Sequence, residues 1–249
     1  MVETFDVSIT PYGLTRRTFV YLPDDWQTSG KKYPVLYMFD GHNLFFDSTA
    51  TYGTCWGLKE YCDAHPNWII AAPECNHEGN KRLEEYCPYQ SDWFGGITGT
   101  GHEYMEWLTK EFKPMMDKRY PTLPGRANTA IGGSSMGGLM SLYALLQYND
   151  TFSRAAALSP SIWASPEKLS GLVGRAKLEP GTVLYMDYGS REMGNHDGMR
   201  KGFAQLTEKL MVRGIHLTAR LVPGGTHSEA SWEKQLPFVF HTLMYELDE

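Results

Sequence analysis

Short apolar runs alternate with longer amphipathic stretches along most of the chain. The strand-like runs are residues 5–10, 18–22, 35–39, 68–72, 129–132, 155–158, 183–186 and 217–222. The helix-like stretches are residues 103–118, 139–148, 199–212 and 232–247. Several of the strand-like runs are almost continuously apolar, which is typical of parallel strands covered on both faces. The pattern predicts an α/β fold with a mostly parallel sheet of about eight strands, helices on both faces, and an antiparallel edge formed by the first two strands.

The length of the chain and the absence of linkers bear on its domain organisation. Layered α/β folds of roughly 200–250 residues are commonly one domain. We therefore expect a single domain over residues 1–249, because no repeat or low-complexity stretch interrupts the pattern. Between residues 73 and 102 there is no clear periodic segment, and loops of this length are usually functional or disordered. The segment is rich in aromatic residues, so we expect an ordered loop over a site.

The charge balance and the distribution of apolar residues limit the partners. The net charge is −6, with no basic block, which argues against nucleic acid and anionic membranes as main partners. No apolar run approaches the roughly 18–20 residues that a membrane helix needs, and the N-terminus lacks the pattern of a signal peptide. We expect a cytoplasmic protein that acts on a small molecule. An oligomer is compatible with the sequence but not indicated by it.

The cysteines suggest neither a metal site nor a redox motif. They are Cys55, Cys62, Cys75 and Cys87. None forms a C-x-x-C pair, and no histidine completes a zinc-binding spacing. Free thiols in a reducing compartment are the favoured interpretation, and one or two disulfides between loops are the alternative. We expect no metal and no cofactor.

The strongest local motif is Gly133-Ser134-Ser135-Met136-Gly137, a G-x-S-x-G pattern centred on Ser135. A strand-like run precedes it and a helix-like stretch follows, which is the context that a nucleophile elbow requires. The two glycines let neighbouring backbones approach, and the serine hydroxyl then projects beside a helix N-terminus whose free N–H groups stabilise negative charge. We predict that Ser135 is the nucleophile. Its neighbour Ser134 lacks the symmetric glycines.

A serine nucleophile needs a histidine that takes its proton. His227 follows the last strand-like run and precedes the last helix-like stretch, so it lies in a loop at the strand's carboxyl end. His216 lies at the entry to a strand and His241 within a helix, where surface or packing roles are expected. We predict that His227 is the general base.

The carboxylate that orients this histidine should follow the preceding strand-like run, residues 183–186. Glu192 lies just past that run, beyond Gly189, and is the predicted acid. Asp187 still belongs to the strand, and Asp197 resembles the start of the next helix. Both aspartates remain open as alternatives.

An acyl-transfer site also needs donors for the oxyanion. The predicted donors are the backbone N–H of Met136 and a backbone N–H of Gly41 or His42, in the loop after the third strand-like run. A second catalytic histidine is the alternative role for the His42 side chain. That role is unnecessary if its backbone donates.

With these pieces in place, the chain resembles the putative esterase family of α/β hydrolases, which includes feruloyl and acetyl esterases, siderophore esterases, S-formylglutathione hydrolase and mycolyltransferases. The resemblance covers nearly the whole chain. The segments that carry it are residues 37–45, Arg82 with Glu85-Tyr86 and Pro88-Tyr89, the Ser135 motif, residues 158–163, residues 189–192, and His227 with Trp232. The resemblance implies the α/β-hydrolase fold and ester hydrolysis through an acyl-enzyme. It also supports Glu192, because the family acid stands at this position.

Aromatic residues are expected around the substrate. The predicted substrate contacts are Trp56, Arg82, Tyr86, Trp93 and Trp163, with Tyr52 and Tyr89 also near the rim. An aromatic lining suits planar acyl groups such as hydroxycinnamates, although aromatic residues are also ordinary core. Arg82 either binds a substrate carboxylate or catecholate, or pairs with Glu84 or Glu85.

The predicted function is a serine carboxylic ester hydrolase that acts on short-chain acyl or aromatic, feruloyl-type esters. One alternative is an acyltransferase of the same fold, in which an alcohol replaces water. Another is a catalytically silent, carbohydrate-binding relative. The complete set of Ser135, Glu192 and His227 counts against this last alternative, because a binding module has no need for it.

Overall fold

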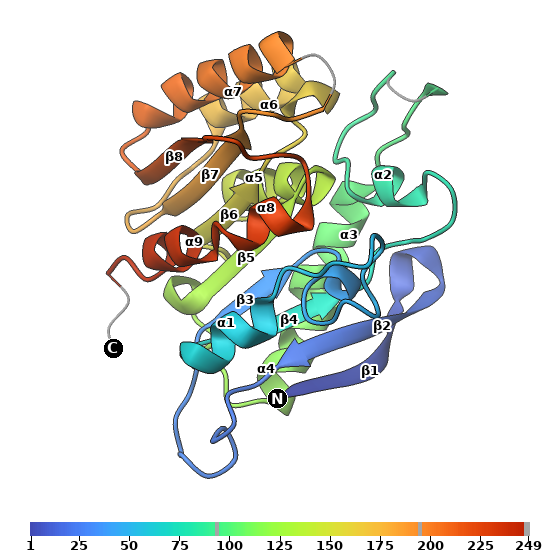
Figure 1. The fold of residues 1–249 in the computed structure, drawn as a ribbon, viewed down its shortest axis with the longest axis vertical. Helices are drawn as coiled ribbons and strands as arrows, with labels where there is room; N and C mark the ends of the chain where they lie inside the picture. The colour runs from blue at the N-terminus through green and yellow to red at the C-terminus, as the bar shows by residue number, and fades with distance from the viewer. Residues whose placement is uncertain (93–94, 194–195, 247–249) are drawn as a thin grey trace.

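The computed structural model describes residues 1–92, 95–193 and 196–246, and the eight strands in these ranges form one sheet. Their order across the sheet is β1-β2-β4-β3-β5-β6-β7-β8. The strands are β1 (Val2–Ile9), β2 (Leu14–Tyr21), β3 (Val35–Met38), β4 (Ile69–Pro73), β5 (Thr129–Ser134), β6 (Arg154–Leu158), β7 (Val183–Gly189) and β8 (His216–Val222). The predicted α/β fold with a mostly parallel sheet is confirmed (Figure 1).

The strand pairings place the loops that matter for function at one edge. β1 pairs with β2 and β2 with β4 in antiparallel fashion, so the predicted antiparallel edge is confirmed. The remaining neighbours pair in parallel. Because the carboxyl ends of parallel strands meet at the same edge, the loops after β3, β5, β7 and β8 face one region, where ligands of open α/β sheets bind.

The central strands are buried on both faces, as their continuous apolar runs predict. In β3, Val35 and Tyr37 belong to one hydrophobic cluster, while Leu36 and Met38 belong to the other. This alternation follows from the two-residue period of a strand, which turns successive side chains to opposite faces. Each cluster is then closed by its own layer of helices.

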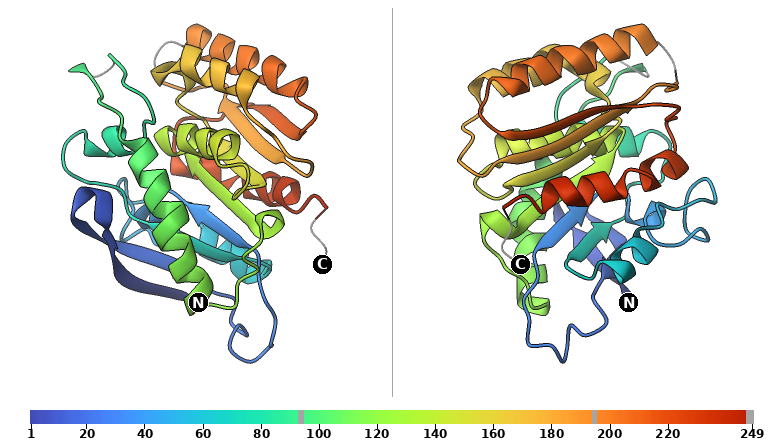
Figure 2. Two further views of the ribbon diagram at one scale, coloured as in Figure 1. Left: turned by 180° about the vertical axis from the view of Figure 1, so that it is seen from behind. Right: turned by 60° about the vertical axis from the view of Figure 1, so that its left-hand side comes forward.

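Helices cover both faces of the sheet. The α-helices are α1 (Leu58–Ala64), α2 (Lys81–Glu85), α3 (Gly101–Trp107), α4 (Lys113–Arg119), α5 (Met136–Gln147), α6 (Pro166–Arg175), α7 (His196–Met211), α8 (Glu229–Glu233) and α9 (Leu236–Leu243). Figure 1 shows α1, α8 and α9 in front of the sheet, and the left view of Figure 2 shows α3 to α7 on the opposite face.

The helix predicted over residues 232–247 is wrong in one respect, because the structure divides this region into α8 and α9. Pro237 occupies the first turn of α9. Proline lacks the N–H that would continue a preceding helix, but it fits the first turn of a new one. The sequence pattern followed the apolar period and missed this break. The end of the prediction, residue 247, lies outside the described residues.

The long segment between residues 73 and 102 is ordered where the structure describes it. It contains the short helix α2, which the periodicity did not indicate. The Glu84 carboxylate accepts hydrogen bonds from the backbone N–H groups of Thr98 and Gly99, at 2.8 and 3.1 Å, and so joins the two arms of the segment. Trp93, one of the predicted substrate contacts, lies outside the described residues.

The four cysteines are free thiols, as the favoured interpretation predicted. Cys55 is half-buried and the other three are buried. Within the described ranges, no helix is long and apolar enough to cross a membrane.

Candidate active site

Ser135 occupies a strained turn between β5 and α5. Its φ of 58° and ψ of −119° lie in a region that residues other than glycine rarely adopt. The flanking glycines are sterically required, since a Cβ on Gly133 would lie 2.9 Å from the carbonyl carbon of Gly137. A Cβ on Gly138 would lie 2.9 Å from the Leu158 carbonyl oxygen. The close packing of strand, turn and helix therefore depends on Gly133 of the motif and on Gly138, which directly follows it.

Hydrogen bonds to the last residue of β6 and to the loop after it hold the Ser135 backbone in this conformation. The Ser135 N–H donates to the Leu158 carbonyl at 3.0 Å, and the Ser161 N–H donates to the Ser135 carbonyl at 2.9 Å. The Ser135 hydroxyl is half-buried and lies 3.4 Å from the Ser161 hydroxyl. By contrast, Ser134 is the last residue of β5 and is buried. Of the two adjacent serines, Ser135 is the one that lines the cavity described below.

His227 and Glu192 meet from the loops that follow β8 and β7. His227 Nδ1 lies 2.5 Å from Glu192 Oε2, and the glutamate side chain is buried. The two loops approach closely at Gly189 and Gly225, where a Cβ on Gly189 would lie 2.5 Å from the Gly225 carbonyl oxygen. The Arg191 N–H also donates to that carbonyl at 2.8 Å. This contact between glycines sets the distance between the histidine and the carboxylate.

The second oxygen of Glu192 is also bound. Oε1 accepts hydrogen bonds from the Ser159 hydroxyl at 2.5 Å and from the Gly189 N–H at 3.1 Å. The Ser159 hydroxyl in turn accepts a hydrogen bond from Trp232 Nε1 at 3.0 Å. Burial tends to raise the pKa of Glu192, but the hydrogen bonds from His227 and Ser159 outweigh it and hold this pKa below its usual value. The carboxylate is therefore charged at neutral pH.

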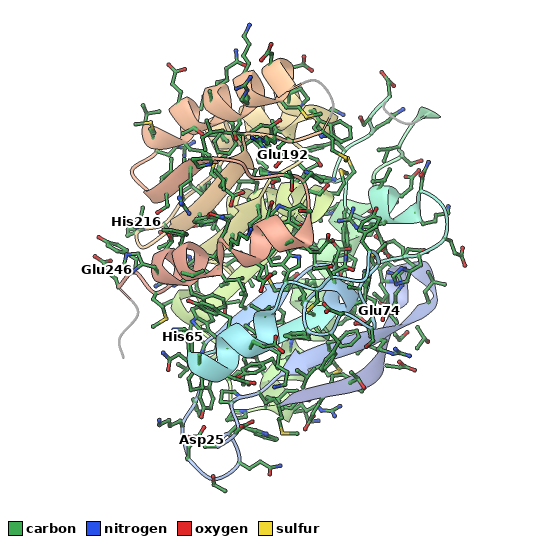
Figure 3. The ribbon with its side chains drawn as sticks, in the orientation of Figure 1. Asp25, His65, Glu74, Glu192, His216 and Glu246 are labelled. Carbon is green, nitrogen blue, oxygen red and sulfur yellow. The ribbon has the colours of Figure 1, made fainter. Side chains whose placement is uncertain are left out.

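The alternative acids have other partners. Asp187 accepts hydrogen bonds from the Tyr185 hydroxyl at 2.8 Å and from the Ser159 N–H at 3.0 Å. Asp197 pairs with Arg200 in the first turn of α7, and its side chain is 92% exposed. Figure 3 labels Glu192, the carboxylate that contacts His227. Sequence reasoning missed Ser159 and Trp232 as partners in this network, although both lie in segments that carried the family resemblance.

Asp187 should make stability depend on pH. Burial raises its pKa to about 6, despite the hydrogen bonds from Tyr185 and Ser159. The folded state therefore holds more protons than the unfolded state between about pH 4 and 6, and ionisation of Asp187 costs stability as the pH rises through this window. The free energy of unfolding of Asp187→Asn relative to wild type should increase by about 2 kcal/mol between roughly pH 4.5 and 7.5. Urea unfolding of both proteins, with Asp197→Asn as control, measures this; a difference that stays constant with pH contradicts it.

The loop after β3 lies against the start of α5. Its turn begins at Asp40, with a φ of 59°, and continues as a short 3₁₀ helix over Gly41–Asn43. Gly41 admits no side chain, because a Cβ there would lie 2.0 Å from the Ala72 carbonyl oxygen. A Cβ on Gly137 would lie 3.0 Å from Phe39 Cβ, so this loop and the first turn of α5 are in contact. The first N–H groups of a helix have no intrahelical partner, and the starts of the 3₁₀ helix and of α5 adjoin here.

The His42 side chain lies elsewhere than the cavity lining. It is buried, with Nε2 3.0 Å from the Thr51 hydroxyl and its ring 4.5 Å from the His77 ring. Burial lowers the pKa of His42 to about 4, although Asp40 opposes the shift. The imidazole is therefore neutral at physiological pH.

Arg82 has a partner that sequence reasoning did not consider. Its guanidinium forms two parallel hydrogen bonds to Asp40, from Nε to Oδ1 and from Nη2 to Oδ2, each 2.7 Å long. Neither Glu84 nor Glu85 pairs with it in these contacts; Glu85 instead forms a buried ion pair with Arg16. The alternative in which Arg82 pairs with Glu84 or Glu85 is therefore wrong, because the fold brings Asp40 next to Arg82 across 42 residues of sequence. Planar bidentate pairing of this kind fixes the loop after β3.

One cavity of about 610 Å³ is lined by several of the candidate groups, but not by Gly41 or His42. Ser135, Met136, Glu192 and His227 contribute to its lining. Its apolar lining comes mainly from α7 and the segment after β6, and includes Leu83, Pro160, Ile162, Trp163, Pro166, Met193, Met199 and Phe203. Such a cavity has the size and polarity of a small-molecule site. The residues of α7 were not anticipated as lining, although the helix is amphipathic.

Of the aromatic residues predicted to contact substrate, the structure places one in the cavity lining and two in the core. Trp163 lines the cavity. Trp56 is buried in the core against Trp232, with ring centroids 5.7 Å apart, and Tyr86 is fully buried against Phe39. For these two, the prediction of a substrate contact is corrected to a packing role. Aromatic residues of both kinds look alike in a sequence, since large rings serve cores and sites equally.

The fold and the geometry of the candidate site together define a class of protein. A serine in a strained strand-to-helix turn, a paired histidine and carboxylate on neighbouring loops, and a glycine-bearing turn after β3 adjoin the carboxyl edge of an eight-stranded sheet. This is the arrangement of the α/β-hydrolase fold.

Within this class, the chain belongs to the family described as "Putative esterase", which matches residues 12–242. It is a carboxylesterase-type hydrolase, as the resemblance implied. Among curated proteins, it is 26% identical to the uncharacterized protein YbbA of Bacillus subtilis over 200 residues, which are 78% of this chain and 76% of that protein.

Solved structures share the fold at low sequence identity. A ferulic acid esterase is 20% identical with a TM-score of 0.71, and the match covers 97% of this chain and 98% of that one. The enterobactin esterase FES from Shigella flexneri is 18% identical with a TM-score of 0.75, over 100% of this chain and 60% of that one. These likenesses concern the fold.

Proposed function

We propose that the protein is a serine carboxylic ester hydrolase in which Ser135 is the nucleophile, His227 the general base and Glu192 the acid that orients the base. The observation that carries the proposal is the 2.5 Å contact between His227 Nδ1 and Glu192 Oε2, in a cavity that Ser135 also lines. With Nδ1 bound to a carboxylate, Nε2 is the nitrogen that can take a proton from a serine hydroxyl. The geometry therefore supports a triad.

In the proposed reaction, Ser135 Oγ attacks the ester carbonyl carbon while His227 Nε2 takes the hydroxyl proton. The tetrahedral intermediate collapses, the C–O bond to the alcohol breaks, and His227 returns the proton to the departing alcohol. A water molecule then attacks the acyl-enzyme, again with His227 as base, and releases the carboxylic acid and free Ser135. Glu192 stabilises the positive charge that His227 carries in each step.

The oxyanion of both tetrahedral intermediates needs backbone donors. We assign this role to the N–H of Met136 and to an N–H of Gly41 or His42. The contact between the loop after β3 and the first turn of α5 supports this choice, since it brings the two helix starts together. Donors of this kind are typically worth about a hundred- to a thousandfold in rate.

The acyl group is proposed to be short or aromatic. The cavity is bounded by Trp163, Ile162 and Phe203, which suit a planar ring or a short chain. The ferulic acid esterase that shares the fold makes feruloyl-type esters reasonable test substrates. Arg82 is not part of this proposal, because Asp40 already binds its guanidinium.

A panel of aryl esters from acetyl to octanoyl, together with methyl ferulate, tests the proposal. We expect the highest kcat/KM for short acyl groups and for the ferulate, because Ile162, Trp163 and Phe203 in the cavity lining suit a short chain or a planar ring. A fluorophosphonate should inactivate the enzyme by losing fluoride and attaching to one residue, which peptide mass spectrometry should identify as Ser135. Hydrolysis of none of these esters contradicts the proposal, as does a label on another residue. Transfer of most acyl groups to an added alcohol identifies an acyltransferase instead.

A further inference from the structure

Three side chains that are common metal ligands lie together outside the cavity lining. His42 belongs to the 3₁₀ turn after β3, and Cys75 and His77 follow β4. One nitrogen or sulfur atom from each lies within 4.8 Å of the others. The parallel pairing of β3 with β4 brings these loops together across more than thirty residues of sequence.

The His42 ring presents an unused nitrogen to this cluster. Its Nδ1 is buried and has no hydrogen-bond partner among the residues that the structure describes, while Nε2 lies 3.0 Å from the Thr51 hydroxyl. A buried nitrogen without a partner is costly and calls for an explanation. With Nε2–H donating to Thr51, Nδ1 carries a lone pair, and this is how outer partners prepare a histidine for a metal ion. The His77 ring lies 4.5 Å away, nearly perpendicular.

Cys75 and His77 supply the other two candidate metal ligands. The Cys75 side chain is buried and the His77 side chain is accessible. Cys75 is 3% exposed, whereas the His77 side chain is 55% exposed and can reorient. The Glu74 carboxylate lies 3.7 Å from His77 Nε2; Figure 3 labels Glu74. An ion can therefore enter from the His77 side and find a thiol, two imidazoles and a nearby carboxylate.

We propose that His42, Cys75 and His77 bind a transition metal ion of borderline softness, of which Zn²⁺ is the representative, with water or Glu74 as fourth ligand. Two imidazoles and a thiolate form the ligand set that Zn²⁺ prefers. Ligands of tetrahedral Zn²⁺ lie roughly 3.3–3.8 Å from each other, so the side chains close by about an ångström on binding. Cys75 binds as a thiolate and releases one proton to the solvent.

The bound ion should stabilise the folded chain. It ties the turn after β3 to the loop after β4, and a ligand that binds only the folded state raises its stability. The site does not rest on the proposed ester chemistry, because its ligand side chains are not among the groups that line the cavity of Ser135 and His227. The backbone N–H of His42 is a candidate oxyanion donor, but only its imidazole binds the ion.

Titration calorimetry of chelator-treated protein with Zn²⁺ tests the proposal. We expect one Zn²⁺ per chain, a binding enthalpy that varies with buffer because a proton is released, and a higher Tm. Cys75→Ser and His77→Gln should each weaken binding by more than the roughly 10- to 100-fold that loss of an outer-shell partner costs. Co²⁺ should give a thiolate charge-transfer band in wild type that Cys75→Ser lacks.

Matched variants distinguish Zn²⁺ binding at this site from nonspecific Zn²⁺ binding by surface groups. Cys55→Ser removes another free thiol. His65→Gln removes an exposed histidine, which Figure 3 labels and whose Nδ1 lies 2.9 Å from the Tyr61 carbonyl oxygen. Both should bind Zn²⁺ like wild type. Wild type that binds no Zn²⁺ overturns the proposal, as does Zn²⁺ binding that His77→Gln and Cys75→Ser leave intact. Because His77 is exposed, we expect His77→Gln to fold normally. Its Zn²⁺ affinity therefore tests the proposal even if Cys75→Ser fails to fold.

Discussion

Replacing Ser135 by alanine should lower kcat for ester hydrolysis by about 10⁴- to 10⁶-fold, with little change in substrate binding or Tm. Ser135→Ala removes the proposed nucleophile. The nearby Ser161 hydroxyl, 3.4 Å from that of Ser135, comes from the loop after β6 and not from the turn at the start of α5. The fold should survive, because alanine keeps the small Cβ that the strained turn already accommodates. Steady-state hydrolysis of an acetyl aryl ester measures the loss, and unfolding curves check the fold.

Ser134→Ala is the matched control for this experiment. Ser134 is adjacent in sequence but buried at the end of β5, so its hydroxyl is not among the groups that line the cavity. We expect this variant to hydrolyse the ester at close to the wild-type rate. If Ser135→Ala retains the wild-type rate, the assignment of the nucleophile is wrong.

Glu192→Gln should lower kcat by about 10⁴-fold at nearly constant KM. The glutamine amide preserves the shape of the carboxylate but offers N–H groups where His227 Nδ1 needs an acceptor. The imidazole then favours the tautomer in which Nε2 carries the proton and cannot take one from Ser135. Loss of the negative charge also removes the stabilisation of protonated His227. The expected signature is a fall in kcat alone, because the substrate does not need Glu192 to bind.

Asp197→Asn provides the comparison for Glu192→Gln. Its carboxylate also follows β7, but it lies in the first turn of α7, is exposed and pairs with Arg200. We expect a kcat within about twofold of wild type, since isolated surface pairs contribute little. Measuring kcat of both variants on one ester tests which carboxylate is the acid. A larger loss of kcat in Asp197→Asn than in Glu192→Gln excludes Glu192 as the acid.

The layered fold could be predicted because its signals are local. The strand β3 is apolar at every position, and its alternate residues belong to the two hydrophobic clusters as that pattern requires. The same reasoning predicted one helix where α8 and α9 stand, because periodicity is averaged over several turns while Pro237 acts at a single residue. Element type is therefore easier to predict than element boundaries.

Side-chain partners at the candidate site were harder to predict. Arg82 pairs with Asp40 across 42 residues, and Trp232 reaches Ser159 across 73. A sequence shows that such side chains can form hydrogen bonds, but the packing of loops selects which donor meets which acceptor. The same limit applies to the proposed metal ligands, whose members His42 and Cys75 match no short zinc-binding spacing.

By itself, the sequence determined the alternation of strands and helices and the position of Ser135 between a strand and a helix. These features arise from contacts between residues close along the chain, such as that between Gly133 and Gly137. Only the tertiary structure decided that Glu192, rather than Asp187 or Asp197, contacts His227. That choice depends on the close approach of two loops from different strands. The free energy of this approach comes from long-range packing, which no local pattern records.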